Sequence, residues 1–426
     1  MLAVLMRLCS LALSSLAWCT LAAYWLGRLA TDSFHLTQFL FFAPGWIYLT
    51  FAASSAAAAL FFRGVQRRIL TARLARAAAL PPTVPPPSPP PPPKARPRLP
   101  TRRLAPIAFV AILALSTACL TLGEYRLWRL VAPAMPATGT TIRIAHWNAM
   151  ANMPVRADMF IPLAADSDAS PATPARPLDI LCWSAAMSSM QARDVVKNSL
   201  GPAYQFDQRG ILFIASRHPI ISVESFHLNL AGPIANHRPL SSTGNDPSVL
   251  AVTGSEPRSL LEYLYNTYGP AIGLQKRAFR NADPGTLLVA KLNVPSLNRP
   301  LVIYYIDLPS DPLRAKRTLA HSAAKTIATF RQTFGEERLP PPDILLGDFN
   351  IPRGSGSLAL LAPGMTSAFD AAGAGIAATW PYAQPLVNID HIFLAGPLRA
   401  TRFEIVDPHR SDHMAIRAEF TIDPPR

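Results

Sequence analysis

Polar side chains gather at the ends of predicted strands in the last two-thirds of the chain. Asp348 and Asn350 follow the predicted strand 343–346 and, being two residues apart, project from the same side of its carboxyl end. Asp412 and His413 precede another predicted strand. Carboxylate, amide and imidazole groups are the ones that transfer protons and bind cations in enzymes. One Asp after a strand is most often a turn or cap residue, but these residues together indicate a site.

Two further polar residues extend the same pattern. Asn148 follows the first predicted strand of this part of the chain, 141–146, and Asp390 stands near the start of the predicted strand 389–394. His413 alone could be a core histidine with satisfied hydrogen bonds. In this order along the chain, the strand-end residues form a stronger signal than any one of them.

The elements that must position these residues alternate between short β-rich runs and helical runs. Nine strands are predicted, at 141–146, 179–183, 210–216, 286–292, 301–307, 343–346, 389–394, 403–406 and 414–422. Helices are predicted at 187–200, 258–268 and 311–330, and residues 231–257 read as a long surface loop. This alternation over roughly 280 residues predicts a layered α/β domain at 141–423.

Charge divides the chain into two unlike parts. The net charge is +14, but residues 1–140 hold 14 of the 40 Lys and Arg residues and only two of the 26 acids. The remaining 286 residues are therefore almost neutral. Strong binding of nucleic acid needs clustered cationic side chains that neutralise several phosphates. Nucleic acid is therefore a disfavoured partner of the large domain.

Three uncharged apolar runs near the start predict membrane-spanning helices. They cover residues 8–27, 36–62 and 104–123, and Pro44 with Gly45 suggests a break in the second. The first run is longer than the apolar core of a cleavable signal, which is the alternative for it. The bilayer is therefore a predicted partner of the chain.

A basic linker joins the second and third predicted spans. Residues 63–103 carry ten Lys and Arg residues and no acid, and residues 81–100 contain 12 Pro. Such a Pro-rich stretch favours an extended chain without a packed core. Because Lys and Arg beside a span resist translocation, the linker is expected in the cytoplasm and the large domain on the outer side. Cleavage of the first span would leave that placement of the domain unchanged.

The large domain resembles the endonuclease/exonuclease/phosphatase superfamily, which has the fold of DNase I. The resemblance covers about 141–423 and is most specific at Gly347-Asp348-Phe349-Asn350 and Ser411-Asp412-His413, with support from 143–148, 210–220 and 389–393. It implies a four-layer α/β sandwich, with two packed mixed sheets flanked by helices. Three spans before such a domain are also similar to a group of bacterial membrane proteins, which implies the inner membrane with a periplasmic domain.

The resemblance also implies hydrolysis of phosphoesters with Mg²⁺ or Mn²⁺ as the cofactor. By position, His413 matches the catalytic histidine and Asp390 the acid that pairs with it. Asp348 and Asn350 match the residues that orient water and bind phosphate. Asn148 and Asp412 match the neighbourhood of the metal.

Two positions depart from the pattern of the superfamily. Where the superfamily carries Gln-Glu after its second strand, with the Glu as the principal metal ligand, this chain has Ser184-Ala185. Where the superfamily has a phosphate-binding His, this chain has Asp307. A carboxylate is an acceptor that repels phosphate unless a cation lies between them.

Two interpretations of these departures stay open. In one, Asp307, Asp412 and Asn148 hold a rearranged metal, or another carboxylate such as Glu224 or Glu262 replaces the missing ligand. The domain then hydrolyses a phosphoester or phospholipid-type ligand at the cell envelope. In the other, the domain is a pseudoenzyme that needs no cofactor and serves as a binding or scaffold module. The sequence names no protein partner.

Overall fold

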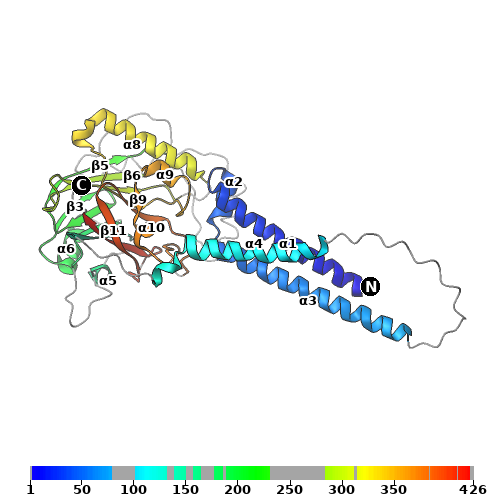
Figure 1. Ribbon diagram of the computed structural model, residues 1–426. Coiled ribbons are helices and arrows are strands. Elements are labelled where there is room, and N and C mark those ends of the chain that lie inside the picture. The colour runs from blue at the N-terminus through cyan, green and yellow to red at the C-terminus, as the bar shows by residue number, and fades with distance from the viewer. Residues whose placement is uncertain are drawn as a thin grey trace, which may run out of the picture. The chain divides into compact units, whose positions relative to one another are not determined.

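The computed structural model describes residues 2–78, 101–131, 139–149, 157–164, 177–185, 189–230, 284–310, 314–382, 384–409 and 411–422. These residues form two compact units (Figure 1). The first comprises Met1–Ala30 and Ala43–Glu124, and the second comprises Thr31–Phe42 and Tyr125–Arg426. The Pro-rich part of the predicted linker, the predicted loop 231–257 and the predicted helix 258–268 lie outside the described residues.

The first unit consists of long apolar helices. They are α1 (Leu2–Ala30), α3 (Gly45–Ala78) and α4 (Thr101–Ala118), which continues as the π-helical turn η1 (Cys119–Glu124). The segments Leu2–Ala30, Gly45–Arg76 and Ala105–Glu124 are each long and apolar enough to cross a membrane. Hydrogen bonds tie the helices together, with Arg63 Nε donating to Ser10 Oγ at 2.9 Å and Trp25 Nε1 donating to Ser116 Oγ at 3.0 Å.

The second span differs from its predicted bounds. Residues His35–Phe42 form a separate short helix, α2, which belongs to the second unit, and the long helix begins only at Gly45. The long helix therefore begins later than the predicted range 36–62, because Pro44 lacks the amide that would continue a helix. At its other end the helix continues past residue 62 to Ala78, through Ala, Leu and Arg residues that favour helix. The predicted linker 63–103 thus begins as helix.

Two six-stranded sheets form the frame of the second unit. The first sheet has the order β11-β12-β1-β2-β4-β3 and the second has the order β5-β6-β7-β8-β10-β9. Their bounds are β1 Thr141–Asn148, β2 Ile180–Ser184, β3 Gln205–Arg209, β4 Leu212–Ser216, β5 Ile220–His227, β6 Thr286–Leu292, β7 Leu301–Asp307, β8 Ile344–Asp348, β9 Thr366–Ser367, β10 Asp390–Leu394, β11 Leu398–Val406 and β12 Ala415–Ile422. Both sheets are mixed, because β1 with β2 and β7 with β8 are parallel and the other paired strands are antiparallel.

Helices cover the outer faces of the two sheets. Helices α8 (Lys316–Arg338) and α9 (Leu358–Leu361) pack on the second sheet through an apolar cluster. The 3-10 turn η3 (Ala157–Phe160) and helices α5 (Ile161–Ala164) and α6 (Ser189–Leu200) lie on the first sheet, on the opposite side of the sandwich (Figure 1). Helix α10 (Ala368–Ala372) lies beside β11. The predicted four-layer α/β sandwich is confirmed.

Alternating side chains of the facing strands fill the space between the sheets. On β1 the inward residues Ile142 and Ile144 join the central apolar cluster, and on β7 the inward residues are Ile303 and Tyr305. Residues between these positions point to the outer clusters, as the period of two in a strand requires. The next inward positions toward the carboxyl ends of these strands are polar, and they form the candidate site.

Candidate active site

Strand alternation carries two polar side chains of β1 to the end of the inter-sheet core. His146 and Asn148 continue the inward row that Ile142 and Ile144 begin. From the second sheet, Asp348 ends β8 and Asp390 begins β10, and these two residues are direct partners in the antiparallel register. Polar groups from both sheets therefore meet at one end of the sandwich.

A third acid stands beside this pair. Asp307 ends β7 and is the register partner of Asp348 in the parallel pairing. Directly before Asp348, Gly347 has φ +140°, and a Cβ there would lie 1.8 Å from the carbonyl oxygen of Ile306. Glycine is therefore required where β7 and β8 end, and it lets the strands bring the carboxylates of Asp307 and Asp348 to one edge of the sheet.

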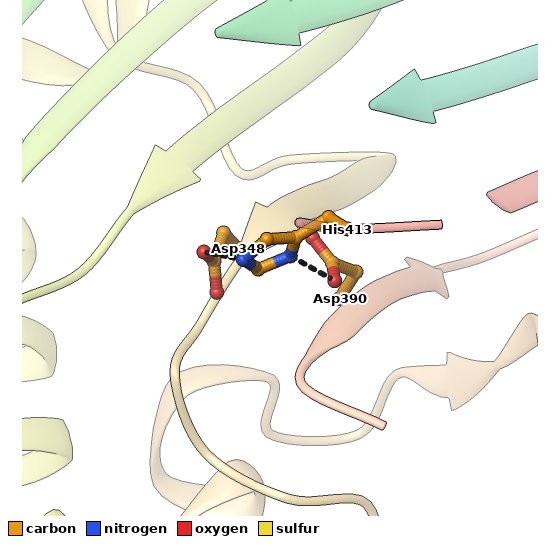
Figure 2. A group of neighbouring side chains, drawn as sticks. All are labelled: Asp348, Asp390 and His413. Atoms are coloured by element: carbon orange, nitrogen blue, oxygen red, sulfur yellow. Dashed lines mark hydrogen bonds and ion pairs between the residues drawn. The ribbon is translucent and has the colours of Figure 1, made fainter. Parts of the chain in front are cut away.

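His413 joins the two buried acids Asp390 and Asp348 (Figure 2). Its Nδ1 lies 2.9 Å from Asp390 Oδ2, and its Nε2 lies 3.7 Å from Asp348 Oδ2. One ligand atom from each of the three residues lies within 4.8 Å of the others, and all three side chains are buried. The backbone amide of His413 donates to Ser411 Oγ at 3.0 Å, which fixes the turn before β12.

Burial and charge shift the pKa values of this group in different directions. Burial, followed by repulsion from Asp390, raises the pKa of Asp348 to about 6. Burial alone would lower the pKa of His413, but the carboxylates of Asp390 and Asp348 outweigh it and raise the pKa to about 10. Burial would likewise raise the pKa of Asp390, yet its two histidine neighbours hold that pKa well below its usual range. At neutral pH the group is thus an imidazolium held by two carboxylates.

Amide groups hold both oxygens of Asp348. Asn148 Nδ2 donates to Oδ2 at 2.9 Å, and the backbone amide of Asn350 donates to Oδ1 at 2.9 Å. Asn350 has φ +51°, a left-handed conformation that Asn tolerates better than most residues. Its side chain donates from Nδ2 to the carbonyl oxygen of Leu308 at 2.7 Å. The carboxylate of Asp348 is therefore fixed in place before any substrate binds.

His146 belongs to the same network, although it was not among the predicted site residues. Its Nε2 lies 2.9 Å from Asp390 Oδ1, and its side chain is buried. Because the depressed pKa of Asp390 keeps that carboxylate ionised, Nε2 is the protonated nitrogen and donates. The signal that could have found His146 is its spacing of two from Asn148 on the predicted strand, which puts both on one face.

The structure also shows the surroundings of Ser184 and Ala185, where the sequence departs from the superfamily pattern. Ala185 is only 3% exposed and packs with Trp147 and Trp183 in the apolar cluster on the outer face of the first sheet. Its methyl group offers no ligand to a metal. The preceding residue, Ser184, instead donates from Oγ to Asn148 Oδ1 at 3.1 Å and so supports the site.

The described part of the chain does not bring Glu224, one of the two suggested replacements for the missing metal ligand, to the site. Glu224 lies on β5, the edge strand of the second sheet, and forms an ion pair with Arg338 of α8. Glu262 lies outside the described residues. Asp412 is half-buried next to His413, and its backbone oxygen accepts a hydrogen bond from the Tyr382 amide at 2.8 Å.

The side chains near this end of the sandwich have the chemistry of ligands for a hard divalent cation. Asn148, Asp307, Asp348 and Asp412 carry oxygen atoms, which Mg²⁺ and Mn²⁺ prefer. Among the described residues, however, the acids and histidines whose ligand atoms lie within 4.8 Å of one another are Asp348, Asp390 and His413, and Asp307 and Asp412 are outside this group. Around the single imidazolium of His413 these acids and Asp390 leave an excess of negative charge. A phosphate could approach these acids only with a cation present. The negative charge of the site therefore favours a cation, as do its oxygen ligands.

Comparison with known proteins supports the expected resemblance. The sequence matches the Endonuclease/Exonuclease/phosphatase family over residues 206–413. No curated protein matches the chain.

Solved structures with low sequence identity align with about two-thirds of the chain. One is an endonuclease/exonuclease/phosphatase family protein from Bacteroides thetaiotaomicron, 13% identical over 67% of this chain and 100% of its own, with TM-score 0.44. Another is a mannosyl-6-phosphatase of the same organism, 13% identical over 66% of this chain and 99% of its own, with TM-score 0.43. A third, an endonuclease/exonuclease/phosphatase from Bacteroides vulgatus, is 16% identical over 67% and 100%, with TM-score 0.42. The segment 206–413 that matches the Endonuclease/Exonuclease/phosphatase family lies within the second unit, and its strands belong to both sheets of the two-sheet sandwich.

Proposed function

We propose that the protein is a membrane-anchored hydrolase of phosphoesters. The observation that carries this proposal is the buried network in which His413 pairs with Asp390 and faces Asp348, while Asn148 and the Asn350 amide fix the Asp348 carboxylate. In this network Asp348 has a pKa of about 6 and His413 stays protonated at neutral pH. A proton-transfer site needs groups of both kinds.

The residues take the following roles in this proposal. Asp348 is ionised above about pH 6 and accepts a proton from the attacking water. His413, protonated at neutral pH, donates to the phosphate oxygens and stabilises their charge as it grows. Asp390 keeps His413 protonated and oriented, and Asn350 stands next to Asp348 for contact with the substrate.

A divalent cation supplies the remaining positive charge. Asn148, Asp307 and Asp412 are the residues that would hold Mg²⁺ or Mn²⁺ in place of the carboxylate missing at position 185. When bound, such an ion polarises the phosphate. In this role Asp307 would bind the cation and not the phosphate itself, which accounts for an acid where the superfamily has a phosphate-binding histidine.

The substrate proposed is a phosphoester of the cell envelope, such as a phospholipid-type headgroup. The near-neutral charge of the large domain supports this choice over nucleic acid. The basic segment around residues 63–103 supports a cytoplasmic linker and an extracytoplasmic domain in a bacterial inner membrane. Protease added to intact spheroplasts should cut residues 141–426 and spare the linker, whereas cutting of the linker alone would reverse the orientation.

One observation favours a second candidate function, a binding or scaffold module without catalysis. Ala185 lies in an apolar cluster and leaves the cation with one carboxylate fewer than the superfamily provides. Because Mg²⁺ is usually held by only one or two protein carboxylates, such a loss weakens the site strongly.

Phosphate release by the purified full chain in detergent distinguishes the hydrolase from the binding or scaffold module. A generic phosphomonoester and a generic phosphodiester are supplied with Mg²⁺ or Mn²⁺, and His413→Ala should lower the rate by about 10²- to 10⁴-fold. His409→Asn is the matched control, because His409 lies four residues away with its side chain 72% exposed. Equal rates for wild type and His413→Ala would contradict the proposal.

A further inference from the structure

The segment Thr31–Phe42 joins the first two apolar helices, yet it packs as part of the large domain. We name these residues the connecting segment. Its polar side chains are not solvated as in an ordinary surface loop, because Asp32 is 2% exposed and Gln38 is 0% exposed. Polar side chains buried to this degree need specific partners. Gln38 bonds to the domain at Arg314 and Lys316, and Asp32 Oδ1 accepts from Thr31 Oγ1 of the same segment at 3.2 Å and from Ser357 of the domain.

Gln38 caps the longest helix of the domain. Its Oε1 accepts from the backbone amide of Lys316, the first residue of α8, at 2.9 Å, and its Nε2 donates to the carbonyl oxygen of Arg314 at 3.1 Å. The N-cap residue of α8, Ala315, has no side chain that could cap the helix. The first amides of a helix lack partners within it, so Gln38 supplies from the connecting segment a cap that the side chain of Ala315 cannot provide.

Asp32 binds a second part of the domain, the turn before α9. Its Oδ1 accepts from the backbone amide of Ser357 at 3.3 Å, directly before α9. The turn before Ser357 comes close to the connecting segment, because a Cβ at Gly356 would lie 3.3 Å from Thr31 Oγ1. On the same turn, a Cβ at Gly354 would lie 3.5 Å from the ring of Phe41. The two glycines allow the close fit.

Both contacts fall on loops that lead out of the candidate site. Asp307 is the last residue of β7, and the next helix, α8, begins at the Gln38 contact. The loop after β8 contains Asn350 and ends at the Asp32 contact. Within the domain the two loops are joined by the hydrogen bond from Asn350 Nδ2 to the carbonyl oxygen of Leu308. The connecting segment therefore bridges the same two loops a second time, at their far ends.

We propose that the connecting segment is a positioning element of the site, with Gln38 and Asp32 as its positioning residues. It fixes the start of α8, which follows β7 and its last residue Asp307 in the chain, and the loop that carries Asn350. Through the chain it links both to the two helices that it joins. The segment and the domain must then lie on the same side of the membrane. The effect on catalysis rests on the proposed function, but the effect on the two loops does not.

Hydrogen exchange of the full chain in detergent tests the proposal without any substrate. Gln38→Ala should speed exchange of the Lys316 amide about fivefold, and Asp32→Ala should do the same for the Ser357 amide, as the loss of one net hydrogen bond implies. Phe34→Ala is the matched control on the same segment, because Phe34 is 68% exposed, and it should change neither amide. Unchanged exchange at both amides in Gln38→Ala and Asp32→Ala would overturn the proposal.

A variant on the domain side covers the case in which the segment variants fail to fold. Gly356→Val adds bulk against Thr31 and should speed exchange at Ser357, and protection equal to wild type would again overturn the proposal. Hydrolysis is measured in parallel, and Gln38→Ala should lower kcat about tenfold with little change in KM. If wild type releases no phosphate but the exchange differences appear, the proposed function fails while the positioning role stands.

Discussion

His146 and Asp390 are joined by a hydrogen bond of 2.9 Å that connects the two sheets at the candidate site. His146 stands on β1 of the first sheet, and Asp390 stands on β10 of the second. The other oxygen of Asp390 accepts from His413, also at 2.9 Å. One buried carboxylate is thus held between two histidines. Its orientation toward His413 therefore depends on His146, which belongs to the facing sheet.

This relationship predicts a positioning role for His146. Replacing it by Leu removes the donor to Asp390 and should lower kcat about tenfold to a hundredfold, because a small misplacement of a catalytic group is costly. His146→Gln keeps an amide donor and should retain most of the rate. Steady-state kinetics of the two variants check this, and equal losses in both would mean that the hydrogen bond is not what matters.

The pKa of Asp348 predicts how activity depends on pH. Since burial raises this pKa to about 6, the proposed base is protonated below that pH and the rate should fall with a midpoint near pH 6. The rate should fall again as His413 loses its proton near pH 10. A pH profile of kcat/KM tests both limbs. A lower midpoint near pH 4, the ordinary range of an exposed Asp, would exclude Asp348 as the base.

The raised pKa of His413 predicts a pH-dependent stability. The folded protein binds this proton more tightly than the unfolded chain, in which the pKa is near 6.5, so the stabilisation is complete below pH 6.5 and is lost as pH rises through about 10. The melting temperature of wild type should therefore fall over that interval more steeply than that of His413→Gln. His391→Gln is the control, because burial lowers the pKa of His391 to about 4. Parallel slopes for wild type and His413→Gln would refute the assignment.

The missing carboxylate at position 185 predicts that metal affinity is below that of an intact site. Ala185→Glu should tighten binding of Mn²⁺ at least tenfold in a calorimetric titration, because it adds an oxygen ligand where the superfamily has one. The longer side chain must leave the apolar cluster around Trp147 and Trp183 to reach the site. Ser189→Glu is a control at the start of α6. If wild type already binds as tightly as Ala185→Glu, the rearranged ligand set of Asn148, Asp307 and Asp412 is sufficient alone.

The sequence predicts the central strands best. Strands β6 and β7 have the predicted bounds, because buried central strands are continuous apolar runs. Strands β3, β5 and β9 were not predicted. All three lie at sheet edges, where the side chains remain partly exposed and the apolar signal is weak. The second span was placed too early, because α2 is as apolar as a membrane helix although it packs on the domain.

The site residues were predicted where the signal is local in the sequence, and less well where it depends on contacts between distant residues. Asp348 and Asn350 can be predicted from the sequence, because both belong to one short motif at the end of a single strand. For His146 the sequence offers only the spacing of two from Asn148, because its partner Asp390 is 244 positions away in the chain. The roles of Gln38 and Asp32 depend on contacts of similar range and leave no pattern in the sequence.

The most direct test of a working hydrolytic site is phosphate release by the detergent-purified full chain with Mn²⁺, compared with Asp348→Asn. Wild type should release phosphate in a reaction that EDTA stops, and Asp348→Asn, which has nearly the same shape but cannot accept a proton at neutral pH, should be slower by at least a hundredfold. Release by Asp348→Asn at the wild-type rate, or no release by wild type with either a phosphomonoester or a phosphodiester, would contradict the account.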